Sequence, residues 1–369
     1  MIKGITFLLL LINTFCLAQW QQTTLSGNTV YCITNKDSIL FAGTNQGIFS
    51  SDDHGNNWVG INNGLTNTTI LSLATNDSIM LAGTMGGGIF ISNDNGQNWI
   101  TTNSGITDSI IYSFCVYNNY IYAGGENGHI YSSFDNGNTW NLLNTGIFNT
   151  SVYGIMNHGS DLFCAIDFGI YESVDSGSTW FQSNVTVTSF RCFGVNGNSL
   201  FAGSGGDGII YSNDDFNTFN VQNNGMNNLN IRSIIIRNNI VYAASYGGGV
   251  AESFDNGMNW IYINDGLNDL NINCLYTDSI YLYAGIGENG VWRRNLNEIT
   301  GINALSNIIF PDNNKIIEVL DIMGRTVINN SQGLITLSEL KRYGMGVYFL
   351  TLQSKKGITH RKIVVLSSN

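Results

Sequence analysis

One octapeptide recurs along the chain at nearly constant intervals, and this spacing constrains the fold more than any other feature. Each copy has Ser first, Asp third, Gly fifth and Trp eighth, with one degenerate exception. The six copies are Ser51–Trp58, Ser92–Trp99, Ser133–Trp140, Ser173–Trp180, Ser212–Phe219 and Ser253–Trp260. Their last residues are 41, 41, 40, 39 and 41 positions apart. A period of about 40 residues with strand-like segments is typical of a propeller blade made of four strands.

Each repeat unit contains the same strand and turn signals. An apolar first strand such as Ile70–Ala74 is followed by a polar turn and by a second strand that ends in Ala82-Gly83. A Gly-rich turn leads to a third strand such as Gly88–Ser92, and the Trp of the octapeptide is expected to open the fourth. The 43 glycines, the 12% of aromatic residues and the single proline suit short strands joined by tight turns. The sequence therefore predicts an all-β fold.

The repeats predict a seven-bladed β-propeller that is closed by its N-terminal segment. First strands begin near Val30, Ile70, Ile110, Val152, Phe190, Ile231 and Ile272. The seventh unit reaches Trp292-Arg293 and has neither an octapeptide nor a fourth strand. The segment Trp20–Leu25 has the pattern of a fourth strand. We expect Trp20 to complete the seventh blade, which leaves no open sheet edge.

The octapeptide could be a chemical site used many times or a turn that the fold needs many times. Asp and Ser side chains can accept backbone N–H groups in a tight turn, and Gly supplies a positive φ. Because a catalytic acid is rarely needed five times at equal spacing, a structural role is favoured over a calcium or catalytic one. The predicted structural residues are Asp53, Gly55, Trp58, Asp94, Gly96, Trp99, Asp135, Gly137, Trp140, Asp175, Gly177, Trp180, Asp255, Gly257 and Trp260.

The octapeptide resembles the Asp-box, or BNR, repeat of sialidase-type propellers. Five copies keep Ser, Asp, Gly and Trp in register, whereas Ser212–Phe219 lacks the Gly and the Trp. The resemblance implies a structural turn between the third and fourth strands, on the face opposite the usual ligand site. The short, uniform turns also resemble propellers of the photosystem II stability/assembly factor type, which implies a binding scaffold.

One position near the start of the first strands is the candidate ligand site. It carries Tyr31, Leu71, Tyr112, Tyr153, Arg191, Arg232 and Asn273. This position lies by the mouth of the predicted channel, where Arg and Tyr could bind an anionic or sugar ligand. Packing between blades with solvated tips is the simpler interpretation of the same column. The candidate ligand-binding residues are Tyr31, Tyr112, Tyr153, Arg191, Arg232 and Asn273, and the acids in nearby turns are Glu126, Asp167, Asp207 and Glu288.

The sequence favours a non-catalytic binding or scaffold protein. The resemblance to sialidases would require three converging arginines, a Tyr–Glu pair and an Asp acid/base, and only Arg191 and Arg232 fit. Relatives that cleave glucans use paired carboxylates across a cleft, usually on two propellers, and this chain has one. The alternative is a sialidase-like glycoside hydrolase acting on extracellular glycans. No catalytic residue is assigned.

The cysteines and histidines do not form a recognisable metal or redox motif. The position after the candidate ligand column carries Cys32, Ser72, Ser113, Gly154, Cys192, Ser233 and Cys274. Small residues here favour Cys as an apolar filler where blades crowd the axis. A disulfide or metal role for Cys32 and Cys274 is the alternative. The four histidines show no ligand spacing, so no metal or cofactor is predicted.

Charge and the first residues indicate an exported protein. The net charge of −11 argues against nucleic acid or an anionic membrane as a partner. Lys3, the apolar run Phe7–Ile12 and the small-residue site Cys16–Ala18 predict a signal peptide over residues 1–18. No other segment is long and apolar enough to cross a bilayer.

The charge changes sign near residue 300, which predicts a domain boundary between a propeller at 19–300 and a tail at 301–369. The net charge is +4 from Gly301 onward and −15 before it. The tail resembles the type IX secretion (Por) C-terminal sorting domain. The matching residues include Gly324, Arg325, Gly346, Tyr348 and Lys362. The resemblance implies a small β-sandwich, recognised by the type IX secretion machinery, on a chain that is secreted or held at the outer-membrane surface after passing through the periplasm.

Fusing residues 305–369 to an exported reporter is expected to move the reporter to the cell surface or the medium. Reporter activity in separated cell fractions measures this. Retention of the reporter in the periplasm would refute the assignment.

Overall fold

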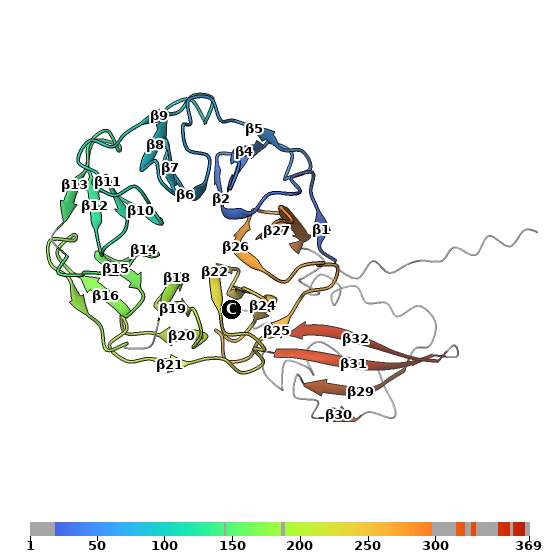
Figure 1. Cartoon of the computed structure of the whole chain (residues 1–369). Coiled ribbons are helices and arrows are strands. Elements are labelled where there is room, and N and C mark those ends of the chain that lie inside the picture. Colours follow the sequence, from blue (N-terminus) through green and yellow to red (C-terminus); the bar gives the residue numbers. More distant parts are fainter. Residues whose placement is uncertain are drawn as a thin grey trace, which may run out of the picture.

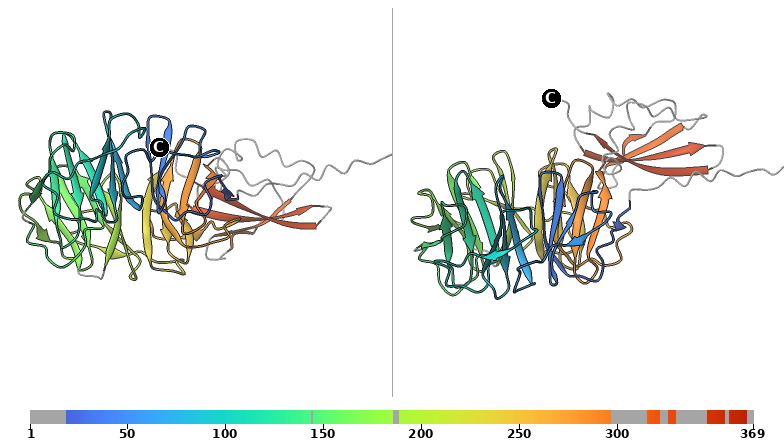
Figure 2. Two further views of the ribbon diagram at one scale, coloured as in Figure 1. Left: turned by 45° about the horizontal axis from the view of Figure 1, so that its top comes forward. Right: turned by 90° about the horizontal axis from the view of Figure 1, so that it is seen from above.

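The computed structural model describes residues 19–143, 145–185 and 189–296 in full, together with the backbone of four strands beyond residue 314. Seven four-stranded antiparallel sheets are arranged as blades around a common axis (Figure 1). The first strand of each blade is innermost, and neighbouring inner strands contact one another around the ring. Seen edge-on, the strands run along the axis of the ring (Figure 2). The predicted all-β, seven-bladed propeller is confirmed.

Strand bounds repeat closely from blade to blade, with outer strands of only two or three residues. From the inside outward, blades one to three contain β2 (Val30–Lys36), β3 (Ile39–Thr44), β4 (Gly47–Ser51) and β5 (Val59–Gly60); β6 (Ile70–Thr75), β7 (Met80–Thr84), β8 (Ile89–Ser92) and β9 (Ile100–Thr101); β10 (Ser113–Tyr117), β11 (Tyr120–Gly124), β12 (Ile130–Ser133) and β13 (Asn141–Leu143). Blades four to six contain β14 (Gly154–His158), β15 (Asp161–Ile166), β16 (Gly169–Ser173) and β17 (Phe181–Gln182); β18 (Phe190–Asn196), β19 (Ser199–Ser204), β20 (Ile209–Ser212) and β21 (Asn220–Val221); β22 (Ile231–Arg237), β23 (Ile240–Ser245), β24 (Gly249–Ser253) and β25 (Ile261–Tyr262). The octapeptide Trp lies just before the outer strand and does not open it, which differs from the sequence expectation by one residue.

The seventh blade is closed by the N-terminal segment, as predicted. It contains β26 (Ile272–Thr277), β27 (Tyr281–Ile286), β28 (Val291–Asn295) and, as its outer strand, β1 (Gln21–Gln22). Gln21 pairs with Arg293 and Gln22 with Trp292. Trp20 is 3% exposed, and its Nε1 donates to the Ile263 carbonyl at 2.6 Å.

Trp20 occupies the place that the octapeptide Trp holds in other blades. Its backbone N–H donates to the Asp265 carbonyl at 2.9 Å, in the turn that follows blade six. In the same way, the N–H of Trp99 donates to Asn63 and that of Trp260 to Asn224. Each of these tryptophans therefore anchors its blade to the turn that follows the preceding blade.

The octapeptide forms one repeated hydrogen-bonded turn. In blade three, Ser133 Oγ donates to Asp135 Oδ1 at 2.8 Å and accepts the Gly137 N–H at 2.9 Å. Asp135 in turn accepts the N–H of Thr139 through Oδ1 and the hydroxyl of Thr139 through Oδ2. The hydrogen bonds from Thr139 lower the pKa of Asp135. Asn136 and Gly137 both have a positive φ, of 56° and 78°, as in a type I′ turn.

The degenerate copy keeps the same turn although it lacks Gly and Trp. Phe216 takes the Gly position at a φ of 60°, and its N–H still donates to Ser212 Oγ at 3.0 Å. Its side chain is fully buried, with ring centroids 5.8 Å from Phe163 and 6.2 Å from Phe193. A bulky residue in this region of φ is strained. Burial of the Phe216 side chain offsets this strain in blade five, whose octapeptide ends in Phe219 in place of Trp.

The described part of the tail forms one antiparallel sheet in the order β30-β29-β31-β32. The strands are β29 (Lys315–Asp321), β30 (Thr326–Asn329), β31 (Gly346–Ser354) and β32 (Gly357–Val365). Gly346 and Tyr348 lie in β31 and Lys362 in β32, whereas Gly324 and Arg325 fall outside the described residues. The second layer of a sandwich stays a prediction, as does the signal peptide, whose residues 1–18 are also outside the described part.

Replacing Trp20 with Ala is expected to destabilise the propeller by about 3–5 kcal/mol, because truncating a buried Trp leaves a cavity and removes the anchor of β1. Denaturant unfolding of the mature chain measures this free energy. The matched control is Gln21→Ala, whose side chain is exposed and whose expected effect is within about 0.5 kcal/mol. Equal stability of the two variants would contradict closure through Trp20.

Candidate functional site

Five of the seven residues of the candidate ligand column lie at β-bulges. In blades one, two, five, six and seven the pairing of the inner strand skips one residue, as between Val30 and Cys32. The skipped residues are Tyr31, Leu71, Arg191, Arg232 and Asn273. A bulge leaves one residue outside the ladder and redirects its side chain. This shared distortion sets the column apart from the regular pairing of the rest of each inner strand.

Tyr112 and Tyr153 occupy the same position in blades three and four, where they come just before the inner strand. Their N–H groups donate to the carbonyls of Gly124 and Ala165 at 2.8 and 3.0 Å. All seven column residues are half-buried. They lie on the face that carries the turns between second and third strands, which we call the upper face. The octapeptides lie on the opposite, lower face.

Arg191 is the centre of a cluster that spans blades three to five. Its guanidinium carbon lies 3.8 Å from the centroid of the Tyr153 ring, close enough for a cation–π interaction. The Tyr153 ring is in turn edge-on to Tyr112, with centroids 5.2 Å apart. Arg191 Nη2 is 3.6 Å from Asp167 Oδ1, a loose ion pair.

Asp167 is held by the groups around it. Its Oδ1 accepts a hydrogen bond from the Ser189 hydroxyl at 3.1 Å, and its Oδ2 accepts one from the Tyr153 hydroxyl at 3.2 Å. Its own N–H donates to Thr150 Oγ1 at 3.1 Å. The Asp167 carboxylate is therefore fixed in position and accepts hydrogen bonds from several donors. It neutralises the positive charge of Arg191 only in part.

Arg232 extends the cluster into blade six. Its guanidinium carbon lies 5.4 Å from the centroid of Tyr246. Burial lowers the pKa of Arg232, and the nearby positive charge of Arg191 lowers it further. The Nε atoms of both arginines are buried and have no hydrogen-bond partner among the described residues. Arg191 and Arg232 are neighbouring cations, and Asp167 forms a weak ion pair with Arg191. Together they make a locally positive site on a propeller whose net charge is strongly negative.

The structure brings four of the six candidates together and leaves two apart. Tyr112, Tyr153, Arg191 and Arg232 form one run along the upper face. Asn273 instead donates from Nδ2 to the Val30 carbonyl at 3.0 Å, which is a contact between blades seven and one. Tyr31 belongs to blade one, two blades from Arg232 around the ring. A ligand-binding role for the column stays a prediction.

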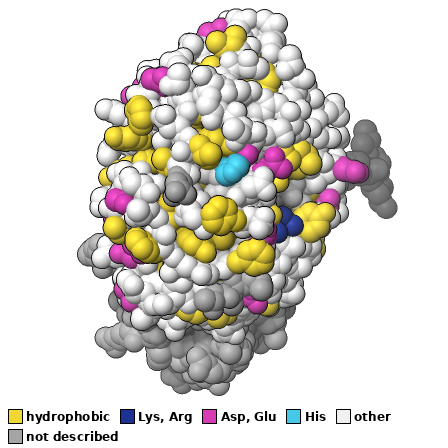
Figure 3. Space-filling view, turned by 60° about the vertical axis from the view of Figure 1, so that its left-hand side comes forward, with side chains coloured by type: hydrophobic (Ala, Val, Ile, Leu, Met, Phe, Trp, Pro, Cys, Tyr) yellow, Lys and Arg dark blue, Asp and Glu magenta, His cyan; other side chains and the backbone are white. Residues whose placement is uncertain are grey.

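Sequence reasoning missed an aspartate–histidine pair on the upper face. Asp108 is buried, and its Oδ1 lies 2.7 Å from Nδ1 of His129 while its Oδ2 accepts the Glu126 N–H at 2.8 Å. The two side chains come from turns 21 residues apart, and spacing alone gave no signal for them. Figure 3 shows one side of the molecule, where exposed apolar side chains are scattered and acidic side chains outnumber basic ones.

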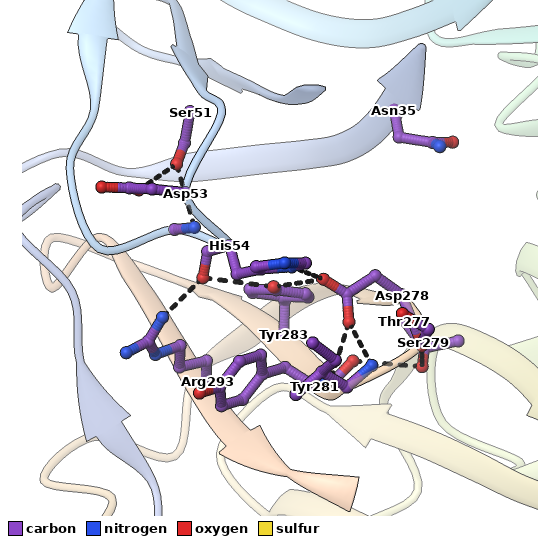
Figure 4. A network of polar contacts seen from close by, with 12 residues as sticks. Asn35, Ser51, Asp53, His54, Thr277, Asp278, Ser279, Tyr281, Tyr283 and Arg293 are labelled. Atoms are coloured by element: carbon purple, nitrogen blue, oxygen red, sulfur yellow. Dashed lines mark hydrogen bonds and ion pairs between the residues drawn. The ribbon is translucent and has the colours of Figure 1, made fainter. Parts of the chain in front are cut away.

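A second polar network lies on the lower face, where blade seven meets blade one (Figure 4). Asp278 Oδ2 lies 2.8 Å from His54 Nδ1 and accepts the Tyr283 hydroxyl at 2.7 Å. Arg293 donates to the His54 carbonyl at 2.6 Å. Burial acts to raise the pKa of Asp278, but hydrogen bonds from Tyr283 and His54 outweigh it and lower the pKa. These groups are hydrogen-bonded to one another, so the network stabilises the contact between blades seven and one.

The cysteine column lies where neighbouring blades come closest. Cys32, Cys192 and Cys274 pair with Gly43, Gly203 and Gly285 on the second strands. A Cβ atom on any of these glycines would lie 2.4 to 2.6 Å from the sulfur, so each thiol fills the space that the glycine leaves. The hydroxyls of Ser72 and Ser113, at the same position, donate to carbonyls of the next blade.

The thiols are free. Cys115, Cys164 and Cys274 are buried, whereas Cys32 and Cys192 are half-buried. All five cysteines of the described chain are unpaired. Burial raises the pKa of the Cys32, Cys115 and Cys192 thiols to about 12. In the fully described ranges, no group of three or more His, Cys, Asp and Glu side chains is placed to hold a metal ion. Within those ranges, no helix is long and apolar enough to cross a membrane.

The tail matches a known family. Residues 302–366 match the secretion system C-terminal sorting domain, which supports the predicted sorting tail. No curated protein matches the chain.

Solved structures share the propeller fold at low identity. YCF48 from Cyanidioschyzon merolae is 16% identical with a TM-score of 0.60, and the match covers 75% of this chain and 98% of that one. PorZ, described as an essential surface component of the type IX secretion system of Porphyromonas gingivalis, is 13% identical with a TM-score of 0.59. That match covers 92% of this chain and 60% of PorZ. The GH74 enzyme of Niastella koreensis is 17% identical with a TM-score of 0.57, and the match covers 73% of this chain and 43% of the enzyme. At these identities the likeness shows the fold alone.

Ellman's reagent is expected to leave the three buried thiols, Cys115, Cys164 and Cys274, unmodified at pH 8 in the folded chain beginning at Gln19, because burial blocks access and raises the thiol pKa. The same protein unfolded in denaturant without reductant should react five times. A denatured and reduced sample is the control. Only three reactive thiols before reduction would instead indicate a disulfide.

Proposed function

We propose that this chain is an exported, non-catalytic binding protein whose propeller recognises an anionic group at the Arg191–Arg232 pair. The observation that carries the proposal is the pair itself. Both guanidiniums are half-buried at bulge positions, both Nε atoms lack hydrogen-bond partners, and Asp167 is 3.6 Å from only one of them. An anion between them would supply the missing charge and hydrogen bonds.

The surroundings of the pair support recognition more than catalysis. Tyr153 and Tyr246 present ring faces to the two guanidiniums, which fixes their planes without neutralising their charge. The carboxylate that pairs with Arg191, Asp167, already accepts hydrogen bonds from Ser189 and Tyr153. A glycoside hydrolase would need a free carboxyl pair at this point. The sialidase-like alternative therefore has only the two arginines in its favour.

The sorting tail and the structural relatives fit a role at the cell surface. The tail would direct the propeller through the type IX machinery, leaving it secreted or on the outer-membrane surface. PorZ is a surface component of that system, and YCF48 is known in a structure bound to D1 peptide. We also infer that the octapeptides are Asp-box turns, which keeps the lower face structural and leaves ligand recognition to the upper face.

Replacing Arg191 or Arg232 with Ala is expected to weaken binding of an acidic ligand by about 10- to 100-fold, because hydrogen bonds to a charged group are worth about 1.5–3 kcal/mol. Glycan and peptide arrays probed with the mature chain identify the ligand, and titration of the best hit gives the affinity. Affinity should also fall as salt is added.

Lys36→Ala is the control, because this cation lies at the lower end of β2. Binding that is equal in all variants would overturn the proposal. Hydrolysis of a fluorogenic sialoside that disappears in the Arg191→Ala variant would favour the enzyme instead.

A further inference from the structure

Blade four exposes two phenylalanines on the upper face, beside the arginine cluster. Phe148 is 72% exposed and Phe168 is 63% exposed. Phe148 lies in the segment that crosses from blade three to blade four, where other blades carry Thr66, Thr107, Asn227 and Asn268. Phe168 lies in the turn between β15 and β16, where most other blades have Gly, Asn or Gln. Two large apolar side chains therefore stand in blade four at positions where most other blades have small or polar residues.

Both phenylalanines are carried by segments fixed to Asp167, the partner of Arg191. Phe168 follows Asp167 directly, and its carbonyl accepts Gln182 Nε2 at 3.1 Å. Phe148 is two residues before Thr150, whose Oγ1 accepts the Asp167 N–H. The Thr150 carbonyl also accepts the Gly128 N–H at 2.6 Å. The backbone segments that carry the two phenylalanines are thus tied to Asp167, which lies 3.6 Å from Arg191.

Several polar groups near the two phenylalanines already have hydrogen-bond partners. Thr150 Oγ1, Ser189 Oγ and the Tyr153 hydroxyl all bond to Asp167. Gln182 bonds to the backbone of the turn. A sugar would present hydroxyl groups that need free donors and acceptors, whereas apolar side chains need only the exposed rings. The cationic pair supplies the charge complementarity for an acidic group at the same place.

We propose that the ligand is a polypeptide segment in which apolar or aromatic side chains flank an acidic residue. The acidic group binds Arg191 and Arg232, and the apolar side chains bind Phe148 and Phe168. This inference rests on the proposed function, because it extends the same site across blade four.

A peptide array tests this directly. Each peptide carries one acidic residue with every amino acid varied at the flanking positions, and the probes are the mature chain and its variants. The wild type should prefer Phe, Leu or Trp beside the acid by about tenfold or more over Ser. Phe148→Ser with Phe168→Ser should lose this flank preference but still require the acid. Arg191→Ala with Arg232→Ala should lose the requirement for the acid.

Phe134→Ser is the matched control, because Phe134 is 61% exposed but lies in an octapeptide on the lower face. It should bind as the wild type does. Binding that needs the acid but shows no flank preference overturns this inference and leaves the proposed function standing. Binding to an acidic glycan and to no peptide would also overturn this inference and leave the proposed function standing. Binding that is unaffected by the arginine variants overturns both.

Discussion

The closed ring depends on the insertion of one side chain from the N-terminal strand of the propeller. Trp20 is buried, donates from Nε1 to Ile263, and donates from its backbone to Asp265. The strand that it brings, β1, contributes only two pairs to blade seven. Without it the outer edge of blade seven would lack a partner strand and the link to the turn after blade six. The upper face needs an intact ring, because seven separate inner strands supply its column.

The lower and upper faces of the propeller differ in how closely their residues repeat from blade to blade. The lower face repeats one turn six times, with Ser and Asp side chains that satisfy the backbone and a Trp or Phe that anchors the blade. The upper face varies from blade to blade. Its unusual residues are the arginines of blades five and six and the phenylalanines of blade four, which lie side by side around the ring. Function in such a repeat fold is best sought where one blade departs from the others.

The fold could be predicted from sequence because its signals are local and periodic. The spacing of the octapeptides predicted four-stranded blades, the seven first strands predicted their number, and the missing fourth strand of the last unit pointed to Trp20. The site could be predicted only as a column. Its bulge geometry depends on the hydrogen-bond register between two strands, and the stacking of Arg191 on Tyr153 depends on the distance between two blades. Phe148 and Phe168 could have been noticed by aligning the units, because they replace polar or small residues. Phe216 could not, since its left-handed φ is opposite to the preference of its residue type.

Hydrogen–deuterium exchange of the mature chain tests closure of the ring most directly. Peptides that cover β28 (Val291–Asn295) should be as strongly protected as those that cover β24 (Gly249–Ser253), the equivalent strand of blade six, whose outer partner is covalently continuous with it. Exchange reports the free energy of local opening, so equal protection means that β1 stays docked. Fast exchange in β28 with full protection in β24 would show that the seventh blade is open and would contradict the account.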